Sequence, residues 1–178
     1  MQEELGMRLN RTPMTVLLLL AAVAAIQMTH YYPLLPERLA VHFGAAGEAN
    51  GWSSKGEFIV LFGAMEAFIV LFGWAFAILL DRIPMALLNI PNKDYWFSPE
   101  RQEESWEFLR NQILWMETAT LGFLVALAQL IFKENLGSAP PRLPDSFWYV
   151  LVAFVAVVLW FSARIIMRFR RPREQAPI

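Results

Sequence analysis

Four long apolar blocks constrain this chain more than any other feature. They occupy about residues 13–32, 58–80, 113–132 and 147–167 of the 178-residue sequence. Each block is close to the roughly 20 residues that a helix needs to cross a hydrocarbon core about 30 Å thick. Lipid offers no partner for backbone N–H and C=O groups, so such segments cross as helices. The sequence therefore predicts an all-α membrane protein, a four-helix transmembrane bundle that forms a single membrane domain over residues 1–178.

Composition supports this class and excludes others. Hydrophobic residues make up 57% of the chain, against roughly 45–50% in soluble domains, and mean hydropathy is +0.40. The net charge of −1 gives no overall basic field for nucleic acid. The absence of cysteine excludes disulfides, thiolate metal sites and cysteine nucleophiles. The expected partners are the lipid bilayer and either another protein or further copies of the chain, and no cofactor is indicated.

The distribution of lysine and arginine predicts the orientation. With both ends in the cytoplasm, the tails and the loop 81–112 hold eleven of the fifteen basic residues, and the other two loops hold four. An excess of Lys and Arg marks the cytoplasmic side. We therefore expect a multi-pass protein of a bacterial-type cytoplasmic (inner) membrane with both termini cytoplasmic.

The two ends of the chain allow alternative interpretations. Arg8 and Arg11, followed by an apolar run and small residues at 22–24, are also typical of a cleaved signal peptide. The apolar run continues to Tyr32, which favours an uncleaved helix, and both interpretations stay open. The basic run 168–171 is interpreted as a stop-transfer anchor, with contact to anionic lipid as the alternative.

The two longer loops are predicted to be ordered. The outer loop, 33–55, is rich in turn formers and contains an apolar stretch, 39–43, that suits an extended segment packed against the helix ends. In the inner loop, 81–112, the aromatic residues at 95–97 are expected at the membrane interface. Ser98 then suits a helix N-cap, followed by Pro99. This predicts a cytoplasmic helix that runs straight into span three.

Both loops carry recognisable motifs. The outer loop reads Leu-Pro at 35–36, His-Phe at 42–43, and Gly-Glu-Ala-Asn-Gly-Trp-Ser-Ser-Lys at 47–55, and the inner loop reads Asn-Ile-Pro-Asn-Lys-Asp-Tyr-Trp at 89–96. These motifs resemble the membrane family called domain of unknown function 1648, which is shared with the N-terminal part of SdpI-type immunity proteins. Gly44, Asn50 and Ser53 depart from residues common in that family. The missing acid at position 50 weakens a metal-binding or proton-carrying role for this loop.

The resemblance implies a multi-span inner-membrane protein and little about a reaction. It marks two candidate sites. The ligand or partner loop comprises His42, Phe43, Gly47, Glu48, Asn50, Gly51, Trp52 and Lys55. The inner motif comprises Asn89, Pro91, Asn92, Lys93, Tyr95, Trp96, Glu100 and Arg101.

Four polar residues fall inside the predicted spans. Gln27 and Glu66 lie at similar depths, so a hydrogen bond between them is feasible, and Glu66 is interpreted either as structural or as functional. Glu117 and Arg164 lie near the inner boundary. Two interpretations stay open: a buried pair between them, or an Arg164 side chain that extends to the lipid phosphates.

His42 has three competing explanations. It can bridge backbone groups in a tight loop, join Glu48 and Lys55 in a polar ligand site, or bind metal with His30 or Glu48. Metal is the weakest of these, because the spacing does not supply a full ligand set.

Three function classes are compatible with the sequence. The favoured one is a non-enzymatic accessory, sensor or immunity-type module, with a cross-membrane link through span two. The first alternative is a small oligomeric proton-coupled transporter that uses Glu66 and Glu117. The second is a membrane enzyme acting at the outer face, which would require His42, Glu48 and Lys55 to converge. The sequence contains no hydrolase, phosphate-loop or zinc-protease motif, so no catalytic residue is assigned.

Overall fold

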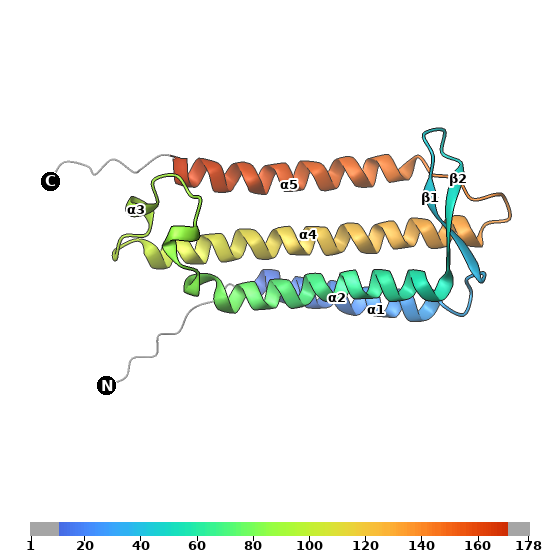
Figure 1. The fold of residues 1–178 in the computed structure, drawn as a ribbon, viewed down its shortest axis with the longest axis horizontal. Coiled ribbons are helices and arrows are strands. Elements are labelled where there is room, and N and C mark those ends of the chain that lie inside the picture. The colour runs from blue at the N-terminus through green and yellow to red at the C-terminus, as the bar shows by residue number, and fades with distance from the viewer. Residues whose placement is uncertain (1–10, 171–178) are drawn as a thin grey trace.

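A computed structural model describes residues 11–170 and contains four long helices. All four are long and apolar enough to cross a membrane, as the sequence predicts, and they lie side by side along the long axis of the molecule (Figure 1). The helices are α1 (Arg11–Tyr31), α2 (Lys55–Leu79), α4 (Gln102–Leu136) and α5 (Ser146–Arg170). The chain therefore has the architecture of a multi-pass membrane protein.

Helix α4 is the central element of the bundle. It packs against α1, α2 and α5, and in Figure 1 it lies between α5 and the α1–α2 pair. Among the described elements, α5 packs extensively against α4 alone, and α5 is the least buried of the four spans. The α4 helix has 35 residues, so the predicted cytoplasmic helix and span three are one continuous element.

Three clusters of buried side chains hold the bundle together, one near each end and one in the middle. The first joins α1, α2, α4 and the outer loop through Met28, Leu35, Leu39, Phe58, Ala128, Ile131 and Phe132. The middle cluster consists of Leu17, Ile69, Leu121 and Leu124. The third joins the inner loop to α4 and α5 through Leu80, Trp96, Phe97, Leu109 and Phe169.

The loop 33–55 contains a β-hairpin, so the fold is mostly and not strictly all-α, and the first strand of the hairpin includes the extended segment predicted at 39–43. Strand β1 (Arg38–Phe43) pairs antiparallel with β2 (Ala49–Ser54). Gly47 turns the chain with a φ of 80°, a conformation that glycine adopts without strain. At the other end of β2, the Ser54 side chain and Glu57 form a capping box that starts α2. We call this end of the bundle the hairpin end.

The loop 81–112 lies at the opposite end, here called the α3 end. It contains two short 3₁₀ turns (Leu80–Arg82 and Met85–Leu87) and the short helix α3 (Lys93–Trp96). The predicted N-cap at Ser98 is wrong, because α4 begins only at Gln102. The Ser98 hydroxyl instead donates a hydrogen bond to the Glu100 carboxylate at 2.7 Å and accepts one from the Arg101 guanidinium at 3.3 Å.

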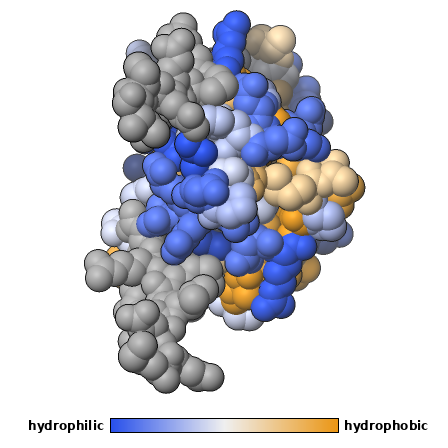
Figure 2. Space-filling view, turned by 90° about the vertical axis from the view of Figure 1, so that its left-hand side faces the viewer, coloured by the Kyte–Doolittle hydropathy of each residue, from blue (hydrophilic) through white to orange (hydrophobic). Residues whose placement is uncertain are grey.

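The exposed side chains divide the surface into an apolar belt and a polar end. Large apolar residues such as Val60, Phe68 and Leu159 are more than 60% exposed along the spans, as lipid-facing residues would be. Figure 2 shows the α3 end face-on, and hydrophilic residues cover most of its visible surface. This distribution fits a bundle that crosses a bilayer with the α3 end in water.

We predict that Phe132→Ala lowers the free energy of unfolding by about 3–5 kcal/mol, because it leaves a cavity where three helices meet. The Phe132 ring is fully buried and contacts Tyr31 of α1 and Phe58 of α2. Unfolding followed in detergent would measure the loss. Phe68→Ala is the control, since Phe68 is 65% exposed. Equal losses in the two variants would show that the hairpin-end cluster is not a packed core.

Candidate functional site

The hairpin is fixed to α4 by one asparagine side chain. Asn135 Oδ1 accepts a hydrogen bond from the Ala40 N–H at 2.7 Å, and Asn135 Nδ2 donates to the Ala40 carbonyl at 3.0 Å. Asn135 thus satisfies both backbone groups of an edge-strand residue, as a neighbouring strand would. This contact holds β1 over the end of α4.

The tip of the hairpin is tied to the α4–α5 loop. Arg142 donates to the Ala46 carbonyl at 2.9 Å, and the Leu143 N–H donates to the Gly47 carbonyl at 2.8 Å. The hairpin therefore extends from the α1–α2 side of the bundle to the beginning of α5, as Figure 1 shows. The predicted order of this loop against the helix ends is present in the structure.

The polar residues of the predicted ligand loop do not converge. The side chains of His42 and Asn50 hydrogen-bond to each other near the tip, whereas Lys55 forms an ion pair with Glu37 at 2.7 Å. Ser54, the neighbour of Lys55, pairs with Arg38, which lies four residues before His42 on β1. Four residues of extended strand span about 13 Å. The hypothesis of a joint His42, Glu48 and Lys55 site is therefore wrong.

Other members of that loop stabilise the hairpin. The Arg38 guanidinium lies 5.8 Å from the centre of the Trp52 ring, and a Cβ atom at Gly51 would lie only 2.6 Å from the His42 Cβ. Phe43 pairs with Ala49 at the end of the ladder. Within residues 11–170, no group of three or more His, Cys, Asp or Glu residues is placed to hold a metal ion.

An apolar cavity of about 670 Å³ lies beneath the hairpin. Its walls come from β1, α2, α4, the α4–α5 loop and the start of α5. The apolar lining includes Val41, Phe62, Met65, Leu124, Leu127, Ile131, Leu143, Phe147 and Trp148. His42 and Glu134 are the ionisable residues of the lining. The cavity thus combines a large apolar volume with two polar side chains from the hairpin end, and no pattern in the sequence predicts it.

The polar residues inside the spans pair differently from the prediction. Gln27 Nε2 donates to Gln129 Oε1 at 2.9 Å and to the Val125 carbonyl at 3.2 Å, and Gln129 in turn donates to the Tyr31 hydroxyl at 2.6 Å. The Gln27–Glu66 hydrogen bond that similar depths make feasible is absent, because the Gln27 side chain faces α4. Glu66 is 6% exposed, and its Oε1 has no hydrogen-bond partner among the described residues.

The buried pair between Glu117 and Arg164 is also absent. Glu117 packs against Gly73 of α2, where an added Cβ would lie 3.6 Å from its Cγ. Arg164 is exposed on α5, with its guanidinium 4.9 Å from the centre of the Trp160 ring. Glu117 thus faces α2, whereas Arg164 is exposed on α5, so the two side chains do not pair.

The inner motif binds the end of α5. Asn92, in the left-handed conformation at φ 54°, donates through Nδ2 to the carbonyls of Phe169 and Arg170 at 3.1 and 3.2 Å. The Trp96 ring N–H also donates to the Phe169 carbonyl, at 3.1 Å. The last carbonyls of a helix have no partner within the helix, so these donors cap α5 from a segment more than 70 residues away in the sequence.

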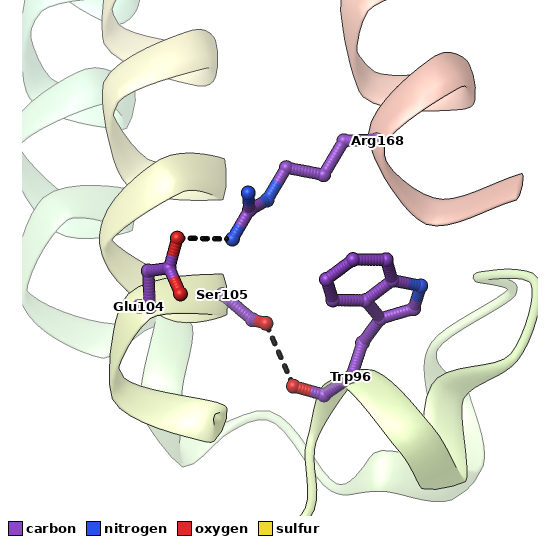
Figure 3. Close-up of polar contacts among 4 residues, drawn as sticks. All are labelled: Trp96, Glu104, Ser105 and Arg168. Carbon is purple, nitrogen blue, oxygen red and sulfur yellow. Dashed lines mark hydrogen bonds and ion pairs between the residues drawn. The ribbon is translucent and has the colours of Figure 1, made fainter. Parts of the chain in front are cut away.

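Contacts from α4 complete this cap. The Ser105 hydroxyl donates to the Trp96 carbonyl at 2.7 Å, and Arg168 forms an ion pair with Glu104 at 2.8 Å (Figure 3). The Arg168 guanidinium also lies 5.1 Å from the centre of the Trp96 ring. Segments α3, α4 and α5 therefore meet in one hydrogen-bonded and aromatic cluster.

The structure adds detail to two predictions for this region. Trp96 and Phe97 are only 4% and 9% exposed, so their rings form a core of the protein, and their depth relative to a membrane interface stays a prediction. The interpretation of the 168–171 run as a stop-transfer anchor stays a prediction, and within this run Phe169 is fully buried and Arg168 pairs with Glu104. Arg171 lies outside the described residues.

The remaining residues of the inner motif are arranged around α3. Lys93 donates to the Met85 carbonyl at 3.3 Å, and the Arg101 guanidinium lies 4.4 Å from the centre of the Tyr95 ring. The hydrogen bond from the Ser98 hydroxyl lowers the pKa of the Glu100 carboxyl. Asn89 and Pro91 are exposed on the loop. The main role of the motif is therefore structural: it caps the C-terminal end of α5.

Comparison with known proteins gives one match. Residues 16–66 match the model of a family described as a domain of unknown function (DUF1648), which confirms the resemblance over α1, the hairpin and the first half of α2. No curated protein and no solved structure matches the chain. The relationship to SdpI-type proteins stays a prediction.

Several residues of these sites carry only a weak signal in the sequence. Gln129 is an isolated polar residue in an apolar run, and that isolation is its available signal, whereas Asn135 follows Lys133 and Glu134 and looks like an ordinary loop residue. The charges around Arg110 suggest a solvated surface, but Arg110 is 5% exposed and donates from Nε to the Ala77 carbonyl at 2.8 Å. Its partner on α2 cannot be identified from the sequence.

We predict that Asn92→Ala destabilises the α3 end by about 2 kcal/mol, since it removes two hydrogen bonds and strains the left-handed backbone. Asn92→Gly is the matched variant, because it loses the same bonds but keeps the conformation, and it should lose about half as much. Faster hydrogen exchange in the last turn of α5 would report the loosened cap. Unchanged exchange in both variants would contradict a capping role.

Proposed function

We propose that this chain is a non-enzymatic membrane module that captures an amphipathic ligand beneath its hairpin. The observation that carries this proposal is the apolar cavity of about 670 Å³ between the hairpin, α2, α4 and α5. Binding sites for small molecules have volumes of about 300–1,000 Å³ and are mainly apolar with a few polar groups. A ligand with an apolar body and a polar head matches this lining.

The packing of α5 provides a route into the cavity from the bilayer. Both α2 and α5 contribute to its walls, but α5 packs extensively only against α4 among the described elements. A molecule in the surrounding leaflet can therefore enter between α2 and α5. His42 and Glu134 would then recognise its polar head.

Capture at the hairpin end would be transmitted through α5. Phe147 and Trp148, at the start of α5, line the cavity, and the last carbonyls of α5 are held by Asn92 and Trp96. A ligand that shifts α5 would therefore change the cap at the opposite end. We favour this path over the predicted link through span two, and it would suit a sensor or immunity-type module.

The two alternative functions have less support. An outer-face enzyme requires His42, Glu48 and Lys55 to converge, whereas Lys55 pairs with Glu37 at the base of the hairpin. A proton pathway requires a connection between Glu66 and Glu117. Glu117 faces Gly73. Gly73 lies seven residues after Glu66 on α2, a rise of about 10 Å along the helix. No hydrogen bond among the described residues joins the carboxyl groups of Glu66 and Glu117.

We predict that Leu127→Trp, which fills the cavity, weakens binding of a dansyl-labelled fatty acid to the detergent-solubilised protein by at least about tenfold. Leu71→Trp is the matched control, because Leu71 is 63% exposed and does not line the cavity. Fluorescence titration would measure both affinities. Equal affinities in the two variants, with both folded, would contradict capture in this cavity.

We also propose that the hairpin end faces outward from a bacterial-type inner membrane and that both termini are cytoplasmic. The chain has no cysteine, so single cysteines report position without background. Ala45→Cys at the hairpin tip should react with an impermeant maleimide in intact cells, and Asn89→Cys should react only after permeabilisation. The reverse pattern would contradict this orientation.

A further inference from the structure

We propose that a second cavity, near the α3 end, binds the headgroup of an anionic phospholipid. This cavity of about 510 Å³ lies between α4 and α5. Its polar lining consists of Asn111 and Gln112 from α4 and Arg164 from α5, and Trp115 and Trp160 are among its aromatic walls. It is separate from the cavity beneath the hairpin and shares no residue with it.

Arg164 supplies the charge that selects an anion. It forms no ion pair with any residue in 11–170, where the basic partners in ion pairs are Lys55 and Arg168. Its guanidinium instead stacks near the Trp160 ring at 4.9 Å, which leaves the donor groups at its edge for a ligand. Guanidinium groups bind phosphate oxygens through paired, charge-assisted hydrogen bonds.

The position of the cavity favours a lipid over a free anion. Arg164 lies five residues before Phe169, and Gln112 lies three residues after Leu109, so both are about one or two helical turns above the α3-end core. The tryptophans that line the cavity are typical of the boundary between headgroups and acyl chains. Glu107, one turn before Asn111, does not line the cavity.

The charge requirement is tested with the purified full-length protein in nanodiscs that contain phosphatidylglycerol and phosphatidylcholine, with retained lipid counted by native mass spectrometry. The wild-type protein should retain phosphatidylglycerol preferentially. Arg164→Gln should reduce that preference about tenfold, the effect expected from losing a charge-assisted contact. Arg170→Gln removes the same charge from the same helix outside the cavity and should leave the preference unchanged.

If Arg164→Gln is unfolded by circular dichroism, Arg164→Lys replaces it, and a retained preference for anionic lipid then supports the proposal.

Three results would overturn the proposal. The first is equal phosphatidylglycerol retention by the wild-type protein and folded Arg164→Gln. The second is full displacement of the lipid by millimolar inorganic phosphate in detergent, which would indicate a simple anion site. The third is a dimer in native mass spectra that Arg164→Gln dissociates, because a second copy of the chain would then occupy the α4–α5 surface.

Discussion

The packing of α4 against the other three long helices is the contact on which the rest of the structure depends. Its apolar residues join α1 and α2 in two buried clusters, and it is the one helix against which α5 packs extensively in the described structure. Its polar residues receive both connecting loops. Asn135 binds the backbone of β1, and Ser105 binds the backbone of α3. One helix therefore positions the hairpin, the inner motif and the walls of both cavities.

A second constraint explains the form of the loops. Backbone groups near the membrane need partners within the protein, because lipid supplies none. The chain meets this need with side chains from distant segments: Arg110 binds the Ala77 carbonyl, and Asn92 and Trp96 bind the end of α5. Residues that look like a surface recognition sequence thus supply hydrogen-bond donors to backbone carbonyls of the helices. For the inner motif, this structural role explains why its unusual residues are present, and no bound ligand is needed to explain them.

The helices were predictable from sequence because length and apolar content are local properties, and all four predicted spans correspond to helices. The contacts between them were not. Asn135 and Ala40 are 95 residues apart, and no period along the chain indicates that they meet. Gln27 and Glu66 have matching depths, but the direction of each side chain around its helix decides the partner, and Gln27 faces Gln129. The hairpin cavity was equally hidden, since three separate helices and a strand form its walls.

The two cavities place α5 at the centre of any functional argument. Residues at its start line the hairpin cavity, and residues near its end line the cavity that contains Arg164. Because α5 has extensive packing on one side only, small changes in its position against α4 alter both cavities at once. A ligand at the hairpin end that favours one position of α5 would therefore change the lipid affinity at the α3 end. Thermodynamic linkage then requires the lipid to change the affinity for that ligand by the same factor. Coupling across the bilayer would thus follow from the one-sided packing of one helix, without a polar path through the membrane.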